Sequence, residues 1–171
     1  MTSKRISFVN KYYPYAYEVW LKTGFPISSI LAQCAIETGN GATIVGNMMF
    51  GVKSTKTDEP RQLLVTKEES KNGNLIFPEI KSKVLIDGIY HYIVKDWFRK
   101  YNSPEESFSD HANFLLKNKR YANALKFKDK PTYFSREIAR AGYATAVGYD
   151  KTFISVTLEI YLYLVKVGQQ Q

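Results

Sequence analysis

The chain has 171 residues, 44% of them hydrophobic and 23% charged, which is enough for one domain with a substantial core. Its 24 Lys and Arg residues against 16 Asp and Glu residues give a net charge of +8, which favours an anionic partner such as cell-wall polymer, nucleic acid or a membrane surface. Like charges never form a block of five or more and no apolar run has membrane length, so we expect neither a nucleic-acid partner nor membrane insertion.

Two helices are predicted in the N-terminal part of the chain. The first, from about Ile6 to Lys22, is rich in aromatic residues, and Pro14 predicts an interruption or a bend within it. In the second, apolar residues recur at spacings of three and four, and Gly39 and Gly41 predict the end of the helix. Glu37 therefore lies in the last turn of the second helix, at the edge of its apolar face.

This position predicts a raised pKa for the Glu37 carboxyl group. Burial beside Ile30 and Cys34 disfavours the charged form, and so does the negative end of the helix dipole. A carboxylic acid that stays protonated near neutral pH can give the proton that the leaving oxygen must receive when a glycosidic bond breaks. Glu37 is thus a candidate general acid, although an ordinary glutamate at a helix end has the same local sequence.

A β-rich region follows, at about residues 52–98. The sequence predicts a strand at Gln62–Thr66, a turn at Lys71–Asn74, and a hairpin whose turn is Asp87-Gly88 with β-forming residues on both sides. These signals indicate a small β lobe within an otherwise helical chain.

Helices resume after the β lobe. Ser103 is the predicted N-cap of a helix, with Pro104 at its first position and Glu106 as the capping-box glutamate. A further helix is expected from about Tyr133 to Gly142, and a last one at Lys151–Val165. The predicted fold class is α+β, mainly helical with a small β-hairpin lobe, in a single domain over residues 1–171.

The one cysteine and the two histidines do not indicate a reactive or metal site. Cys34 lies on an apolar helix face and is predicted to be a buried thiol. His91 and His111 are isolated in the sequence, so we expect no metal and no cofactor. The N-terminal segment lacks the apolar core and cleavage site of a signal peptide, so none is expected.

Two blocks of sequence resemble glycoside hydrolase family 73, the bacterial and phage glucosaminidases that cut peptidoglycan. Residues 30–53, ILAQCAIETGNGATIVGNMMFGVK, are similar to the family signature LAQAALESGWG…NNLFGIK. FRKY, ESFSDH, FL, RY and AGYAT, at residues 98–145, follow the order of the family series FRxY…ESFxDHxxFL…RY…AGYAT. The resemblance runs from about residue 8 to about residue 164. It implies a lysozyme-like fold with a cleft, and hydrolysis of the β-1,4 bond after N-acetylglucosamine in peptidoglycan.

The resemblance also implies roles for individual residues. Glu37 corresponds to the general acid, and Tyr143 to an active-site tyrosine that orients or stabilises the reacting sugar. Without the resemblance, packing after a helix C-cap would be the favoured explanation of Tyr143. Four further residues match cleft or substrate-contact positions: Asn47, Phe50, Tyr121 and Thr145.

The second carboxylate is left open by the sequence. An inverting enzyme needs a base about 6.5–9.5 Å from the acid and a retaining enzyme needs a nucleophile at about 5–5.5 Å, unless the 2-acetamido group of the substrate attacks. Thr66-Lys67-Glu68 matches a Thr-x-Glu element of the family, which favours Glu68. Matching backwards from the Asp87-Gly88 turn puts the family glutamate near Val84 instead, so three alternatives remain: Glu69, Glu79 and Asp96.

Two departures from the family pattern fall near the expected cleft. Asn40 replaces the tryptophan after the family's ESG, and Ala146 and Val147 replace the aspartate and proline after AGYAT.

The alternative functions are a muramidase or lytic transglycosylase on the same fold, or a non-catalytic wall-binding phage tail component. The expected partners are peptidoglycan glycan strands together with virion or lysis proteins. A chain without a signal peptide suits a phage lysin that is either associated with the virion or released at lysis. An exported bacterial protein is the alternative.

Overall fold

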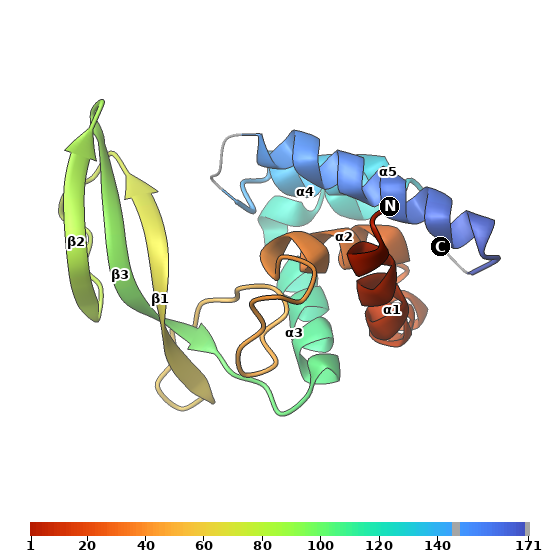
Figure 1. Ribbon diagram of the computed structural model, residues 1–171, viewed down its shortest axis with the longest axis horizontal. Coiled ribbons are helices and arrows are strands. Elements are labelled where there is room, and N and C mark those ends of the chain that lie inside the picture. The colour runs from red at the N-terminus through yellow and green to blue at the C-terminus, as the bar shows by residue number, and fades with distance from the viewer. Residues whose placement is uncertain (145–147, 170–171) are drawn as a thin grey trace.

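The computed structural model describes residues 1–144 and 148–169. A body of helices lies beside a three-stranded sheet, which stands at one side of the molecule (Figure 1). The helices are α1 (Ser3–Thr23), α2 (Ile27–Glu37), α3 (Pro104–Lys117), α4 (Pro131–Arg140) and α5 (Tyr149–Lys166), with short 3₁₀ helices η1 (Lys119–Tyr121) and η2 (Ala124–Phe127). The strands are β1 (Arg61–Ser70), β2 (Glu79–Ile86) and β3 (Ile89–Arg99).

Helix α1 continues through Pro14, so the predicted interruption does not occur. A proline inside a helix removes one backbone hydrogen bond and costs about 3 kcal/mol or more. Burial of an apolar face offsets this cost, since Val9 and Ala16 are fully buried on either side of Pro14 and α1 packs against α2 and α3. The helix ends at Gly24, whose φ of 72° is the left-handed conformation typical of a helix C-terminus.

Helix α2 is buried along nearly its whole length rather than on one face. Every residue from Ile27 to Ala35 is buried, including Ser28 and Gln33, because α1, α4 and α5 pack around the helix. A helix surrounded in this way forms the centre of a core. Only the last turn, with Glu37, reaches the surface of this core. The end of α2 before Gly39 confirms the predicted position of Glu37.

The β lobe is a three-stranded antiparallel sheet in the order β1-β3-β2. Asp87 and Gly88 have φ values of 49° and 76°, and Ile86 pairs with Ile89, which confirms the predicted two-residue hairpin. The strands cover residues 61–99, and an isolated bridge from Lys53 to Phe98 joins the preceding segment to the lobe. Strand β1 lies nearest the helices and β2 farthest from them (Figure 1).

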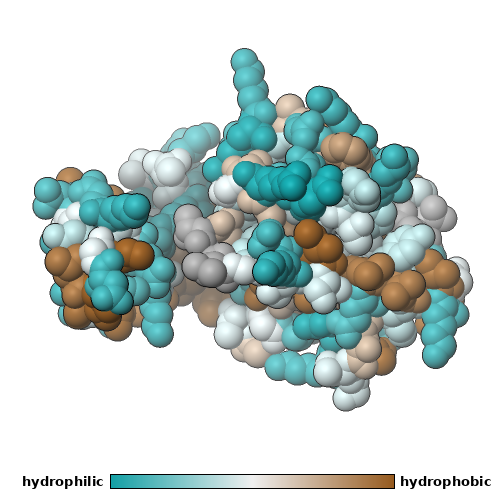
Figure 2. Space-filling view, turned by 90° about the horizontal axis from the view of Figure 1, so that it is seen from above, coloured by the Kyte–Doolittle hydropathy of each residue, from teal (hydrophilic) through white to brown (hydrophobic). Residues whose placement is uncertain are grey.

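The sheet is a single layer, so many of its apolar side chains stay exposed. Seen from above, the lobe stands apart from the helical body, and apolar residues gather on it (Figure 2). Val65, Val84 and Ile86 are each about half exposed. The helical core therefore carries the stability of the fold, and the lobe depends on its attachment at residues 53 and 98–101.

The remaining helices begin close to the predicted positions. The Ser103 hydroxyl accepts from the backbone N–H of Glu106 at 3.3 Å, and the Glu106 carboxylate accepts from the N–H of Asn102 at 2.8 Å, a variant of the predicted capping box. Helices α4 and α5 each start two residues earlier than expected. The α+β class is confirmed. In the described part of the chain, none of the helices is long and apolar enough to cross a membrane.

Candidate active site

The end of α2 opens into a pocket of about 470 Å³ between the helical body and the segment that leads to the β lobe. Glu37 lines this pocket from α2, and Lys53 lines it from the side of the lobe. The other lining residues come from segments far apart in the sequence: Phe50, Gly51, Val52, Thr55, Arg99, Phe114, Arg120, Tyr121, Tyr143 and Ala144. The fold thus brings Glu37 together with two of the tyrosines that the sequence singled out.

The Glu37 carboxyl group has the raised pKa that its position predicts. Partial burial at the end of α2 raises its pKa from an ordinary value of 4.5 to about 7, and the Tyr149 hydroxyl acts in the opposite direction. A substantial fraction of Glu37 is therefore protonated at neutral pH. This is the state that a general acid requires.

Tyr143 lies among aromatic rings beside Glu37. Its hydroxyl donates to the backbone carbonyl of Phe50 at 3.2 Å, and its ring stacks on Tyr149 with centroids 6.3 Å apart. Burial raises the pKa of Tyr143 well above its ordinary range, so the phenol stays neutral and remains a hydrogen-bond donor. Its position fits the predicted active-site role, which is not tested by these contacts.

The other predicted contact residues differ in where they lie. Tyr121 lines the pocket, and its buried hydroxyl makes no hydrogen bond of normal geometry within the described residues. Phe50 lines the pocket, although its side chain is buried and its ring stacks on His111 with the ring centroids 3.9 Å apart. Asn47 does not line the pocket: its amide donates to the carbonyl of Tyr101 at 3.0 Å, which fixes the loop after α2. Thr145 lies outside the described residues.

The candidate second carboxylates fall on two faces of the sheet. Glu68 lies on β1, and the Lys53 ammonium group bridges it and Asp96 at 2.8 and 2.9 Å. Glu69 pairs with His91, and Glu79 pairs with Lys95. Because side chains alternate along a strand, the register places these two acids on the face opposite Glu68 and Asp96. Glu68 and Asp96 are thus the two candidates connected, through Lys53, to the Glu37 pocket.

Three residues beside Glu37 were missed by the sequence reasoning. Tyr149 and Gln33 carry buried polar atoms, the hydroxyl and Nε2, that make no hydrogen bond of normal geometry within the described residues. Gln33 lies one helical turn before Glu37, a spacing that was available in the sequence. Arg120 lines the pocket, and its guanidinium lies 4.7 Å from the ring centre of Tyr121. No local signal marks Tyr149, which meets Glu37 only through packing of α5 on α2.

Cys34 and His111 are both buried and uncharged, and His91 lies on the β lobe, paired with Glu69. Cys34 is fully buried, as predicted, and burial raises the pKa of its thiol. Burial lowers the pKa of His111 to about 3, so the ring between Phe50 and Tyr143 stays neutral. Neither residue forms the thiolate–imidazolium pair of a cysteine nucleophile.

The comparison with protein families decides what kind of protein carries this site. Residues 13–162 match the glucosaminidase family model, described as mannosyl-glycoprotein endo-beta-N-acetylglucosaminidase. The chain belongs to the glucosaminidase family. This confirms the resemblance to glycoside hydrolase family 73 drawn from the sequence motifs.

Sequence similarity to individual proteins agrees with this assignment. The chain is 32% identical to peptidoglycan hydrolase FlgJ of Vibrio cholerae over 162 residues, covering 91% of this chain and 44% of the relative. It is 28% identical to the protein of the same name from Pseudomonas aeruginosa, covering 91% of this chain and 37% of that relative. The chain therefore spans less than half the length of these glucosaminidase relatives.

Solved structures show the same fold. The glycoside hydrolase domain of Salmonella typhimurium FlgJ superposes with a TM-score of 0.70 at 26% identity, covering 98% of this chain and 94% of that domain. A peptidoglycan hydrolase mutant from Sphingomonas sp. A1 superposes with a TM-score of 0.68 at 23% identity, covering 92% and 97%, which supports the fold alone. The predicted lysozyme-like α+β fold of the glucosaminidases is confirmed.

Proposed function

We propose that this chain is a peptidoglycan hydrolase that cleaves the β-1,4 bond after N-acetylglucosamine, with Glu37 as the general acid. The observation that carries the proposal is the Glu37 carboxyl group, which has a pKa of about 7 and lies on the wall of a pocket between two parts of the fold. The family membership and the FlgJ relatives support the same activity. No cofactor is part of this proposal.

The pocket residues have complementary roles in this reaction. Protonated Glu37 gives its proton to the glycosidic oxygen as the bond to the leaving sugar breaks. Tyr121 forms part of the pocket wall with its hydroxyl buried, and the Arg120 guanidinium over its ring is exposed and can donate to a sugar hydroxyl or acetamido group. Tyr143 holds the backbone at Phe50, and thereby the part of the pocket wall that lies against Glu37.

We propose Glu68 as the base or nucleophile of the reaction. Its support is the ion pair with Lys53, since Lys53 itself lines the pocket that contains Glu37. Asp96 shares the same ammonium group and is the direct rival of Glu68. A third route, attack by the substrate's own acetamido group, needs neither carboxylate.

The proposed place of action is the bacterial cell wall. Association with a phage particle, release at phage lysis, and virion or lysis proteins as partners remain predictions. The relatives named above come from bacteria, so they give these predictions no support.

Mass spectrometry of digested peptidoglycan tests the proposed activity. Products with N-acetylglucosamine at the reducing end are expected from the wild type, and about 10²–10⁴-fold more slowly from Glu37→Gln. Reducing-end N-acetylmuramic acid would identify a muramidase instead, and an anhydromuramic end would identify a lytic transglycosylase. Binding to the wall without any release of products would identify a wall-binding protein and contradict the proposal.

A further inference from the structure

A second groove lies next to the Glu37 pocket, along α3. It has a volume of about 820 Å³ and shares Arg99 and Phe114 with the Glu37 pocket. Three lysines line it: Lys56 before the β lobe, Lys117 at the end of α3, and Lys119 in η1. We call this surface the lysine groove. Because the two cavities share two lining residues, they lie side by side, and a group attached to a ligand in the Glu37 pocket lies close to the lysine groove.

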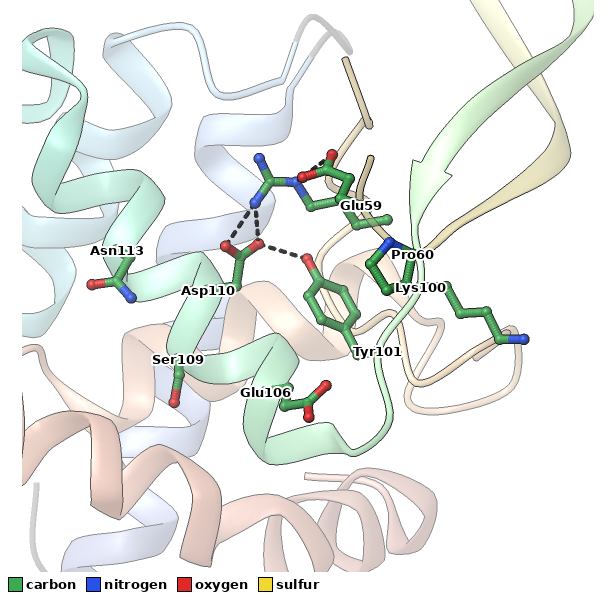
Figure 3. Close-up of a pocket in the computed structure, with 9 residues that line it drawn as sticks. Glu59, Pro60, Lys100, Tyr101, Glu106, Ser109, Asp110 and Asn113 are labelled. Atoms are coloured by element: carbon green, nitrogen blue, oxygen red, sulfur yellow. Dashed lines mark hydrogen bonds and ion pairs between the residues drawn. The ribbon is translucent and has the colours of Figure 1, made fainter. Parts of the chain in front are cut away.

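The acidic residues of this region are already paired with Arg99. Its Nη1 lies 2.7 Å from both carboxylate oxygens of Asp110, and its Nε lies 3.5 Å from Glu59 (Figure 3). The Tyr101 hydroxyl donates to the same Asp110 carboxylate at 2.7 Å. Arg99 carries one positive charge against the two negative charges of these acids, so the three groups leave one net negative charge, and Arg99 is held as a structural link between β3 and α3.

The three lysines of the groove have no such partners. All three side chains are exposed, and in residues 1–144 and 148–169 none of their ammonium groups forms an ion pair. The three positive charges of these lysines exceed the one net negative charge left by Arg99 with Glu59 and Asp110, so the groove as a whole is positive. Lysine side chains, with point charges on flexible stems, suit several carboxylates whose positions vary.

We propose that the lysine groove binds the carboxylates of the peptide stems of peptidoglycan. This inference rests on the proposed function. A glycan strand of N-acetylated sugars carries no charge of its own along the sugar rings, whereas the stems attached to every second sugar end in carboxylates. A strand whose scissile bond lies at Glu37 has a stem-bearing sugar next to that bond. Its stem enters the groove at Arg99 and Phe114, which the two cavities share.

The proposal predicts a preference for strands that carry stems. One peptidoglycan sample is divided, and half is treated with an amidase that removes the stems and leaves the glycan uncut. Hydrolysis of each amide bond frees a lactyl carboxylate on the sugar, and these carboxylates are then converted to methylamides so that the stem-free strand carries no charge. Release of reducing ends gives kcat/KM on each half. The readout is the ratio of kcat/KM on stem-bearing strands to kcat/KM on stem-free strands. Each variant is compared with the wild type, so differences in solubility between the two substrates cancel.

Two matched variants separate the groove from the overall charge. The groove variant combines Lys56→Gln, Lys117→Gln and Lys119→Gln. The control variant combines Lys4→Gln, Lys151→Gln and Lys166→Gln, which removes the same charge from exposed positions outside the groove. We expect the ratio to fall about 3–30-fold in the groove variant, through a higher KM on stem-bearing strands, and to stay at the wild-type value in the control.

Other outcomes would overturn the proposal. An unchanged ratio in the groove variant, or an equal fall in both variants, would show that the groove does not recognise stems. If extraction of phosphate polymers from the wall reproduces the effect and removal of stems does not, the groove binds phosphate and the stem assignment is wrong. A wild type that cuts neither substrate contradicts the proposed function instead. Co-sedimentation with stem-bearing walls then tests the groove alone, and equal retention of both variants would refute it.

Discussion

The hydroxyl of Tyr143 donates a hydrogen bond to the backbone carbonyl of Phe50 across 93 positions of sequence. This contact joins the segment after α4 to the segment that leads from α2 to the β lobe. Glu37 lies in the same pocket, and Gly51 next to Phe50 lies so close to it that an added Cβ would be 3.4 Å from the carboxylate. The backbone at Phe50 and Gly51 therefore approaches the proposed acid directly, and Tyr143 holds it there.

Replacing Glu37 by Gln tests the general acid. The amide keeps the shape of the side chain but has no transferable proton, so turnover should fall about 10²–10⁴-fold. Release of reducing ends from peptidoglycan measures the loss, and circular dichroism checks that the variant is folded. Hydrolysis of the cell wall by Glu37→Gln at a rate near that of the wild type would contradict the proposed mechanism.

The same variant should change the pH dependence of stability. The Glu37 pKa is about 7 in the folded protein against an ordinary value of 4.5, so the folded state binds more protons than the unfolded state between these values. The free energy of unfolding of the wild type should therefore fall as pH rises from about 4.5 to 7, and this contribution should level off above 7. Glu37→Gln lacks this loss. The melting temperature of the variant minus that of the wild type should therefore be larger at pH 8 than at pH 5. The same difference at both pH values would contradict the raised pKa.

Tyr149→Phe should move the pH profile of activity. The Tyr149 hydroxyl lowers the pKa of Glu37, so its removal should raise that pKa. Activity requires protonated Glu37, and the alkaline limb of kcat/KM should therefore shift to higher pH. Tyr163→Phe is the control, since its hydroxyl bonds to Asn10 on the helical body. A shift to lower pH, or the same shift in the control, would show that Tyr149 does not act on Glu37.

Tyr143→Phe tests the link between Tyr143 and the pocket wall. Loss of the hydroxyl leaves the Phe50 carbonyl without this donor, which should cost about 0.5–1.5 kcal/mol of stability. If Tyr143 also acts in the site, kcat should fall by more than the small loss of folded protein explains. Steady-state kinetics and thermal melts on Tyr143→Phe and Tyr163→Phe separate the two effects. Equal kinetics in both variants would leave Tyr143 with a packing role.

The role of Glu68 is tested against its neighbours on the sheet. If Glu68 is the base or nucleophile, Glu68→Gln should lose activity on the scale of Glu37→Gln, and the double variant should lose little more because both act in one step. Asp96→Asn disturbs the same lysine, and Glu69→Gln changes an acid on the opposite face, so both should retain most activity. If the acetamido group attacks instead, Glu68→Gln should cost little, and substrates with a hydroxyl in place of that group should fail.

The sequence by itself determined the features that depend on neighbouring residues. Glu37 was placed at a helix end by Gly39, the hairpin by Asp87-Gly88, and the start of α3 by Ser103 with Pro104. In each case a backbone conformation or a cap within a few residues decides the structure. The motif order around these residues was also sufficient to name the family.

Only the tertiary structure decided which side chains meet. Helix α1 continues through Pro14 because burial against α2 and α3 outweighs a local cost that the sequence shows clearly. The contact of Tyr149 with Glu37, and of Lys53 with both Glu68 and Asp96, joins segments that no local pattern connects. Burial sets the pKa of Glu37, and the distance between charges sets the pairing of the carboxylates. Both depend on packing between residues that are distant in the chain.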